Sequence, residues 1–379
     1  MVLKKIVYLS NSTIPSKTAN SVHVMKMSSA ISELGYQVLL IVRNKNKKNK
    51  IDVFQYYGIK ETFKIKSVYY PQIKLNWVLY GYNCYRLVRK IKSDLIIYAR
   101  NLFGAFLCSK NGYRTIYECH MPPKRIWDKY FLRKIIIRNN SKIIVISHAL
   151  KTILMGIYPF LNESKIVIAH DGVDIKWLET DKNNLSIRKD LKFTDKDFVI
   201  GYVGSLYKGR GINLILKIAS KLRENKFIIL GGNTKEINKL MLKINNLKLL
   251  NVYPLRYVPN SEILRYLVSC TVLLMPYQHN LSIAGNGINT SKYMSPLKMF
   301  EYMASGRPII SSNLPVLKEV LNDDNSILVD PDDLCSWINA INKLKSDEVL
   351  CRRLANNALN NVYEYSWSNR AKLIFSYLV

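Results

Sequence analysis

Short runs of apolar, often β-branched residues alternate along this chain with amphipathic stretches of helical spacing. Between the first two runs, apolar residues recur every three or four positions from His23 to Leu34, and Gly35 follows, which predicts a helix that ends there. The runs that we expect to form strands are Lys5–Ser10, Val38–Arg43, Leu95–Arg100, Thr115–His120, Ile143–Ser147 and Ile166–His170 in the first half, and Phe198–Gly204, Phe227–Gly231, Leu247–Val252, Thr271–Pro276, Pro308–Ser311 and Ile327–Val329 in the second.

Strands that are apolar on both faces and alternate with helices are typical of parallel α/β sheets. The pattern occurs twice, with a restart near Asp195–Phe198, and 379 residues are too many for one ordinary core. We therefore expect an α/β protein of two doubly wound, Rossmann-like domains facing across a cleft. The expected parts are an N-terminal domain (1–170), a C-terminal domain (171–365) and a C-terminal helix (366–379) that packs back on the first domain.

The charge of the chain is strongly basic and unevenly distributed. The net charge is +30, and the first 168 residues hold 29 of the 57 basic but only 7 of the 27 acidic residues. An excess of this kind favours an anionic partner, such as nucleic acid, an anionic membrane or a phosphorylated substrate. The alternative is a lysine-rich proteome, although that bias alone would spread over both halves.

The six cysteines are scattered without a CxxC pair, which argues against a zinc site or a disulfide framework and fits a reducing cytosol. We identify no signal peptide and no apolar stretch that approaches the roughly 18–20 residues of a membrane span.

The stretch GYVGSLYKGRGINLIL (Gly201–Leu216) joins a predicted strand to a predicted helix. Gly204 permits a close approach of the backbone to a ligand, while Lys208 and Arg210 supply positive charge, and this combination suits a diphosphate. A glycine-rich turn with solvated cations is the alternative. Gly232, in the sequence LGGN at the end of a later strand, is a further candidate for a close approach, here to a nucleobase.

The stretch SPLKMFEYMASGRPII (Ser295–Ile310) predicts a buried helix that Ser295 caps and Gly306 ends. Glu301 lies in the middle of this apolar helix. It is either one partner of a surface ion pair with Lys298 or a carboxylate that accepts hydrogen bonds from the two hydroxyls of a ribose. A diphosphate at the glycine turn and a ribose at Glu301 together describe a nucleotide-sugar site.

The chain resembles the group-1, family-4 glycosyltransferases of GT-B architecture over nearly its whole length. The stretches that carry the resemblance are GSLYKGRG (204–211), SPLKMFEYMASGRPII (295–310), AHDGVD (169–174), YECH (117–120) and ISHAL (146–150). The resemblance implies a retaining, metal-independent hexosyltransferase whose C-terminal domain binds a nucleotide-diphosphate sugar and whose N-terminal domain binds the acceptor. It implies no cofactor besides the donor substrate.

The resemblance also implies roles for individual residues. Arg210 corresponds to the cation on the donor diphosphate, Glu301 to the carboxylate on the ribose, and His120 to a histidine close to the reacting sugar; we take these three as catalytic. His23, in the first strand-to-helix loop, is expected to contact the acceptor or the diphosphate. The expected donor-binding set is Gly204, Ser205, Lys208, Arg210, Gly232, Pro296, Leu297, Lys298 and Glu301.

Two positions depart from the family pattern. Tyr293 stands where an acidic residue often lies, eight positions before the ribose carboxylate, and Ser205 stands where a second arginine often lies. Asn286 or Asn289 is expected to replace the acid, and Lys208 to compensate for the arginine. No Asp-x-Asp pair lies on a loop suited to Mg²⁺, so we expect arginine and helix dipoles to neutralise the diphosphate and assign no metal.

Two basic segments, Asn76–Lys92 and Met121–Lys142, contain several aromatic residues, which suggests contact with an anionic membrane; two core helices with solvated basic faces are the alternative. We therefore expect a cytoplasmic enzyme on the inner face of the cytoplasmic membrane that acts on a lipid-linked or other cell-envelope glycan precursor. The alternatives are a sugar-nucleotide epimerase of the same fold and a basic nucleic-acid-binding protein; no nucleic-acid recognition motif appears, so nucleic acid is not an expected partner.

Overall fold

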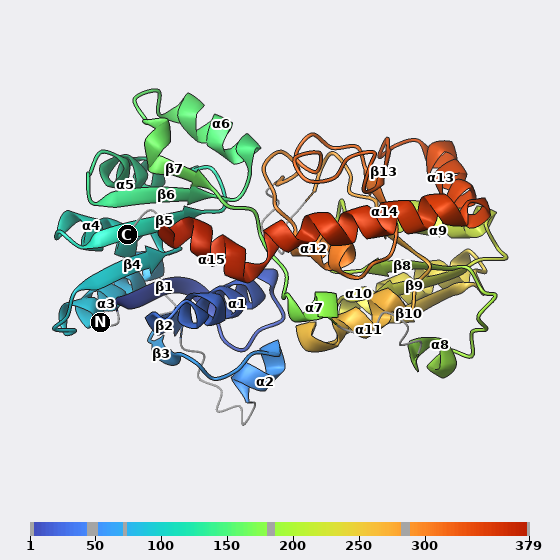
Figure 1. Ribbon diagram of the computed structural model, residues 1–379, viewed down its shortest axis with the longest axis horizontal. Helices are drawn as coiled ribbons and strands as arrows, with labels where there is room; N and C mark the ends of the chain where they lie inside the picture. The colour runs from blue at the N-terminus through green and yellow to red at the C-terminus, as the bar shows by residue number, and fades with distance from the viewer. Residues whose placement is uncertain (1–3, 44–51, 71–73, 180–185, 282–288, 377–379) are drawn as a thin grey trace. The chain divides into compact units, whose positions relative to one another are not determined.

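The computed structural model describes residues 4–43, 52–70, 74–179, 186–281 and 289–376 (Figure 1). The chain divides into two compact units. Unit 1 comprises Met1–Gly172 and Trp367–Val379, and unit 2 comprises Val173–Ser366. Each unit contains one parallel sheet with helices on both faces, which confirms the predicted α/β class of two doubly wound domains.

Among the described residues, unit 1 has a seven-stranded sheet of order β3-β2-β1-β4-β5-β6-β7. Its strands are β1 (Lys5–Thr13), β2 (Gln37–Arg43), β3 (Lys64–Val68), β4 (Leu95–Ala99), β5 (Arg114–Cys119), β6 (Ser141–Val145) and β7 (Ile166–Ile168). The helices are α1 (Ala19–Glu33), α2 (Val53–Tyr57), α3 (Asn76–Arg89), α4 (Leu102–Lys110), α5 (Ile126–Ile136), α6 (His148–Ile157) and α15 (Trp367–Phe375), with a 3₁₀ turn η1 (Glu163–Lys165).

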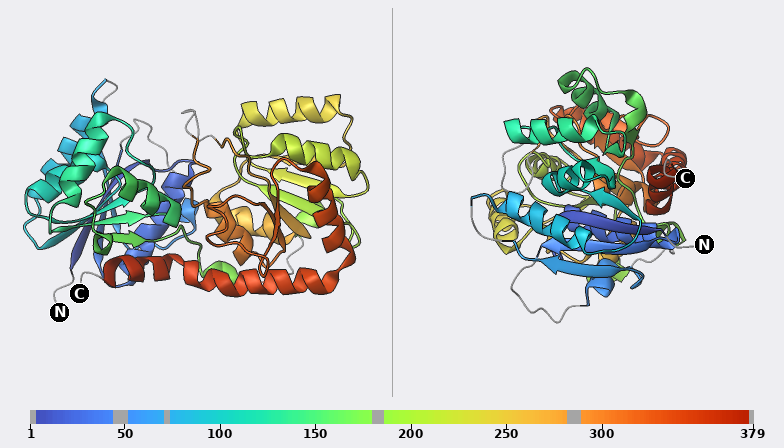
Figure 2. Two further views of the ribbon diagram at one scale, coloured as in Figure 1. Left: turned by 90° about the horizontal axis from the view of Figure 1, so that it is seen from above. Right: turned by 90° about the vertical axis from the view of Figure 1, so that its left-hand side faces the viewer.

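The strand order reverses beside β1, so the helices of unit 1 divide between the two faces of the sheet. Helices α3, α4 and α5 lie side by side on one face, and α1 packs against α15 on the other (Figure 2). The C-terminal helix α15 is therefore part of unit 1, although about 190 residues of unit 2 precede it in the chain.

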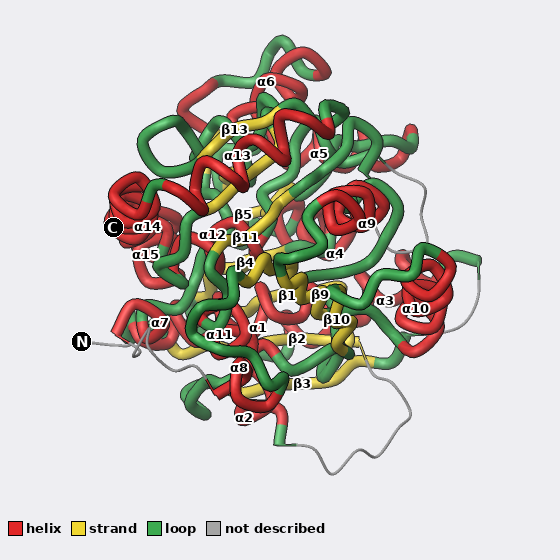
Figure 3. The backbone as a smooth tube through the Cα atoms, turned by 90° about the vertical axis from the view of Figure 1, so that its right-hand side faces the viewer, coloured by secondary structure: helices red, strands yellow, loops and turns green. Residues whose placement is uncertain are grey.

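The described part of unit 2 has a six-stranded sheet of order β10-β9-β8-β11-β12-β13. Its strands are β8 (Val199–Val203), β9 (Lys226–Leu230), β10 (Val252–Leu255), β11 (Val272–Met275), β12 (Ile309–Ser312) and β13 (Ile327–Val329). The helices are α7 (Lys176–Glu179), α8 (Ser186–Asp190), α9 (Ile212–Lys221), α10 (Thr234–Asn246), α11 (Ile263–Val268), α12 (Leu297–Ala304), α13 (Leu334–Ser346) and α14 (Glu348–Asn361), with 3₁₀ turns η2 (Asn260–Glu262) and η3 (Val362–Tyr365). Helices α9 and α10 lie on one side of this sheet, and α11 and α12 lie on the other (Figure 3).

The structure corrects two strand predictions. Where a strand was expected at Leu247–Val252, Leu247 is the C-cap of α10, residues 248–251 form an irregular turn, and β10 begins only at Val252. Leu250, which suggested a buried strand, is 93% exposed. Strand β3 was not predicted because it is an edge strand with two lysines and mostly exposed side chains, so it lacks an apolar run.

Helix α12 also begins differently from the prediction. Its N-cap is Pro296 rather than Ser295, and no side chain caps it with a hydrogen bond. Gly306 follows the helix with a φ of +66°, as its predicted role at the end of the helix requires.

Candidate functional site

The turn between β8 and α9 in unit 2 requires glycine for reasons of packing. Gly209 and Gly211 have φ values of +86° and +78°, and a Cβ at either position would collide with the backbone of the segment that follows β11 (276–281). Gly232, with a φ of +79°, faces the side chain of Leu206 in the same turn. These three glycines thus hold the turn against its neighbours in the fold.

Gly204, at the end of β8, faces the side chain of Lys298, and a Cβ there would collide with the lysine Nζ. Lys298 comes from the first turn of α12 and is only 8% exposed. Its Nζ lies 3.8 Å from the ring centroid of Tyr202 and has no hydrogen-bond partner among the described residues. Because Lys298 is buried, the predicted alternative of a surface ion pair with Glu301 is wrong.

Arg210 brings a second cation to the same place. Its guanidinium carbon lies 4.7 Å from the ring centroid of Tyr277, and its buried Nε lacks a hydrogen-bond acceptor in the described structure. Burial lowers the pKa of Lys298 well below its ordinary value of 10.5, and the charge of Arg210 lowers it further. Two buried donor atoms that repel each other and lack acceptors would both be stabilised by a bound anion.

Glu301 lies one turn after Lys298 on α12 and is half-buried. Its Oε1 accepts a hydrogen bond of 2.7 Å from Nδ2 of Asn260, a buried residue in η2. Asn260 thereby holds one oxygen of a carboxylate, a group that can accept several hydrogen bonds. No local pattern in the sequence indicates this partner, because Asn260 precedes α11 and lies 41 positions from Glu301.

The other residues predicted to bind the donor differ in how exposed they are. Pro296 and Leu297 are half-buried at the start of α12, Lys208 is exposed, and Ser205 uses its carbonyl to accept a hydrogen bond of 2.6 Å from the Tyr202 hydroxyl.

The segment expected to replace the missing acid is described only in part. Tyr293 is buried. The side chain of Asn289 organises a turn through hydrogen bonds with the backbone of His279, Leu281 and Ser291. Asn286 lies outside the described residues.

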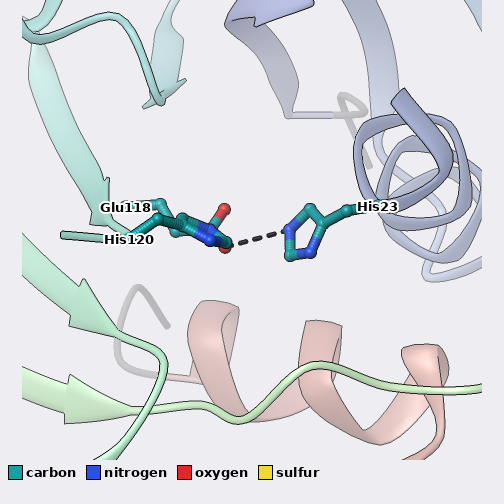
Figure 4. A group of neighbouring side chains, drawn as sticks. All are labelled: His23, Glu118 and His120. Carbon is teal, nitrogen blue, oxygen red and sulfur yellow. Dashed lines mark hydrogen bonds and ion pairs between the residues drawn. The ribbon is translucent and has the colours of Figure 1, made fainter. Parts of the chain in front are cut away.

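Unit 1 contains a second polar cluster, which is centred on Glu118 at the carboxyl end of β5. Its Oε1 lies 2.6 Å from Nε2 of His120 and 2.9 Å from Nε2 of His23, a residue of α1 (Figure 4). Nε2 of His23 makes no hydrogen bond with the described residues, so we treat its approach to Glu118 as an electrostatic contact. Nδ1 of His23 lies 2.9 Å from Oδ1 of Asp171, which follows β7. Arg370 of α15 completes the cluster and donates to the same Glu118 oxygen at 2.7 Å.

Neighbouring groups within this cluster lower the pKa values of both of its carboxyl groups. Burial by itself would raise the pKa of Glu118, but Arg370, His23 and His120 outweigh it and hold that pKa well below its usual range. Burial likewise raises the pKa of Asp171, and His23 lowers it to a net value below the ordinary one. Burial lowers the pKa of His120 to about 4, so His120 is neutral near pH 7.

His23, Glu118 and His120 lie close enough to one another to hold a metal ion. However, Arg370 donates to the Glu118 oxygen that such an ion would bind, and Nδ1 of His23 is engaged by Asp171. A divalent cation would face the arginine charge directly, so we assign this cluster as a hydrogen-bonded network rather than a metal site.

Two family models match the chain in succession. The model described as glycosyltransferase family 4 matches residues 21–177, and the model described as glycosyl transferases group 1 matches residues 183–361. The chain belongs to the group 1 and family 4 glycosyltransferases.

Curated relatives of this family 4 glycosyltransferase are distant. The capsular polysaccharide biosynthesis glycosyltransferase CapM of Staphylococcus aureus is 24% identical over 251 residues, which are 62% of this chain and 60% of CapM. A D-inositol 3-phosphate glycosyltransferase of Corynebacterium urealyticum is 23% identical over 227 residues, which are 56% of this chain and 50% of that protein. The matched region therefore spans between half and three fifths of these relatives.

Among solved structures, Anabaena HepE in complex with UDP and glucose has a TM-score of 0.75 at 17% identity, with 99% of each chain covered. This likeness confirms the GT-B fold. In the described parts of this family 4 glycosyltransferase, no helix is both long and apolar enough to cross a membrane.

The structure groups the predicted residues of this glycosyltransferase by unit. Arg210, Lys298 and Glu301 lie near one another in unit 2, whereas His23 and His120 meet in unit 1. Sequence reasoning missed Asn260 and Arg370. Asp171 was part of the AHDGVD stretch that carried the family resemblance, but no role was assigned to it.

Proposed function

We propose that this protein is a retaining glycosyltransferase that moves a hexose from a nucleotide-diphosphate sugar to a cell-envelope glycan precursor. The observation that carries the proposal is the buried Nζ of Lys298, which lies beside Arg210 and has no hydrogen-bond partner in the described part of the chain, one helical turn from Glu301. Departure of a nucleoside diphosphate develops negative charge, and two basic side chains, each with a buried donor atom that lacks an acceptor among the described residues, are suited to stabilise it. Glu301, held by Asn260, supplies the acceptor for a ribose diol.

Lys298 also accounts for the serine at position 205. The cation that the family often carries there is absent, and the exposed Lys208 was expected to compensate. Lys298 is the better candidate, because its Nζ is buried directly against Gly204, whereas the Lys208 side chain is exposed. On this proposal the second cation of the diphosphate site comes from α12 rather than from the glycine turn.

UDP-sugars are the first donors to test, because HepE, which shares the fold, binds UDP and glucose in its crystal structure. The acceptor class is supported by CapM, whose name places that protein in capsular polysaccharide biosynthesis. Retention of configuration rests on family resemblance. Neutralisation of the diphosphate by Lys298 and Arg210 supports transfer without a metal.

Unit 1 offers a surface for an anionic bilayer, which supports a peripheral position on the inner face of the cytoplasmic membrane and a lipid-linked acceptor. On α5 and just before it, Ile126 and Trp127 are 78% and 59% exposed, and Lys124, Arg125 and Lys129 are exposed beside them. The neighbouring α3 exposes Leu79 and Tyr82 together with Arg86 and Arg89. Aromatic and basic side chains in one region are typical of interfacial segments.

The test of this function is a two-stage panel. Thermal shifts with UDP-, GDP-, ADP- and dTDP-sugars should identify a donor, and the selected donor should then be consumed only when an acceptor is added. Stabilisation by a nucleotide sugar followed by its conversion to an isomer without any acceptor would instead support the epimerase. DNA-dependent mobility shifts without stabilisation by any nucleotide would support the nucleic-acid-binding alternative.

A further inference from the structure

Arg370 connects the last helix of the chain to the polar cluster of unit 1. The residue is 4% exposed, and its Nε donates to the backbone carbonyl of His170 at 2.7 Å. Its Nη2 donates to Oε1 of Glu118 at 2.7 Å and to the carbonyl of Ala169 at 3.2 Å, while Nη1 contacts the Tyr98 hydroxyl at 3.2 Å. The two carbonyls follow β7, so the backbone fixes the guanidinium in place and directs one edge of it at Glu118.

Glu118 is surrounded by charged and hydrogen-bonding groups, and their net effect favours its ionised form. The charged and titratable groups around it are Arg370 from α15, His23 from α1, His120 after β5, Tyr98 from β4, Tyr8 from β1, Asp171 after β7 and Arg100 after β4. Arg370 is the largest of the charge effects that lower its pKa. Without this arginine, burial would favour the protonated acid.

The ionised state of Glu118 determines the tautomer of His120. A carboxylate has no proton to donate, so Nε2 of His120, 2.6 Å from Oε1, must carry the hydrogen. Nδ1 of the neutral ring is then a hydrogen-bond acceptor. The His120 side chain is 19% exposed, whereas Glu118 is fully buried, so the histidine is the member of the pair that a ligand can reach.

We propose that Arg370 is a positioning residue, which acts through Glu118 to hold His120 as the Nε2–H tautomer with Nδ1 free to accept a hydrogen bond from a substrate hydroxyl. This inference rests on the proposed function, and it gives the C-terminal helix a part in the reaction. If Arg370 only fastened α15 to unit 1, its loss would lower stability without changing the state of His120.

The first test needs no activity. Long-range ¹H–¹⁵N spectra of the wild-type protein distinguish the tautomers of its five histidines, with His120 assigned by comparison with His120→Gln. The inference predicts the neutral Nε2–H form of His120 from pH 6 to 8. An Nδ1–H tautomer or an imidazolium at pH 7 would overturn it, whether or not the protein transfers a sugar.

The second test is the pH dependence of kcat in Arg370→Met, Arg370→Lys and Glu118→Gln. Loss of the arginine charge should raise the proton affinity of Glu118, so the acid limb of kcat in Arg370→Met should move toward neutrality by about 1–3 pH units. Arg370→Lys should keep most of the wild-type profile, and Glu118→Gln should lose the limb. Donor KM should change less than about twofold in all three variants.

The matched control is Lys372→Met, which removes an exposed cation from the same helix. It should leave both kcat and the pH profile unchanged. A lower kcat in Arg370→Met with its acid limb at the wild-type pH would show that the arginine is only structural. If Arg370→Met does not fold, the wild-type tautomer and the Arg370→Lys profile still decide the inference.

Discussion

Replacement of Lys298 by methionine removes a buried basic group that has no hydrogen-bond acceptor among the described residues. Two opposed terms determine the effect on stability. The contact with the Tyr202 ring contributes about 2 kcal/mol when desolvated, but burial of the charge costs more than this contact returns, as the lowered pKa of Lys298 shows. We therefore expect Lys298→Met to leave the free energy of unfolding unchanged or slightly raised.

Donor binding should change in the opposite direction. A hydrogen bond from a charged donor contributes about 1.5–3 kcal/mol, so Lys298→Met should weaken binding of the nucleoside diphosphate by about 10- to 150-fold. Lys217→Met is the control, because Lys217 is an exposed cation on α9 of the same unit and should affect neither quantity.

Because the pKa of Lys298 is lowered in the folded protein, both the stability of the protein and its binding of a diphosphate should depend on pH. Between that pKa and 10.5 the unfolded chain binds more protons than the folded one, so wild-type stability should rise with pH across this window, and Lys298→Met should reduce the rise. A bound diphosphate favours the ammonium form. Titration calorimetry in two buffers of different ionisation enthalpy should therefore detect proton uptake on binding in the wild type that Lys298→Met lacks. Unchanged donor affinity together with a loss of more than about 2 kcal/mol of stability would refute this role of Lys298 and make it a structural residue.

Two further predictions concern charge. Arg210→Ala should reduce donor affinity and turnover, and Arg210→Lys should restore them only in part, because the planar guanidinium is replaced by a point charge. Wild-type activity should survive EDTA. A strict metal requirement would contradict the assignment of Lys298 and Arg210 as the groups that neutralise the diphosphate. Wild-type protein should sediment with anionic vesicles at low salt and leave them at high salt, and charge reversal of Lys124, Arg125 and Lys129 together should reduce this binding while donor affinity is kept. Equal sedimentation with neutral vesicles would instead attribute the basic charge of unit 1 to proteome composition or to a soluble anionic acceptor.

Local patterns in the sequence predicted most of the strands, because parallel strands buried on both faces leave an apolar run that is easy to recognise. An edge strand such as β3 has mostly exposed side chains, so it lacks an apolar run and is not predicted. An apolar run that includes exposed residues such as Leu250 predicts a strand where none forms. The residue types of the donor site were also visible in the sequence, since Arg210, Lys298 and Glu301 lie in two short stretches of unusual composition.

Partners that come from distant parts of the chain were not predictable in the same way. Arg370 reaches Glu118 across 252 positions, and nothing in the local sequence of a C-terminal amphipathic helix distinguishes an arginine that faces the core from one that faces solvent. The environment of Lys298 was misjudged for a related reason. Its i, i+3 spacing from Glu301 is common on surface helices, and only the packing of α12 under Gly204 shows that the ammonium is buried.

The measurement that tests the donor site most directly compares a ribonucleoside diphosphate with its 2′-deoxy analogue by calorimetry, in the wild type and in Glu301→Ala. The nucleotide is the one that stabilises the wild type most in the thermal panel. If Glu301 holds the ribose diol, loss of the 2′-hydroxyl should weaken binding to the wild type by about tenfold or more and should have almost no effect in Glu301→Ala, while the alanine variant binds the ribonucleotide about 10- to 150-fold more weakly than the wild type does. An equal loss in both proteins, or full affinity in Glu301→Ala, would contradict this account of the donor site.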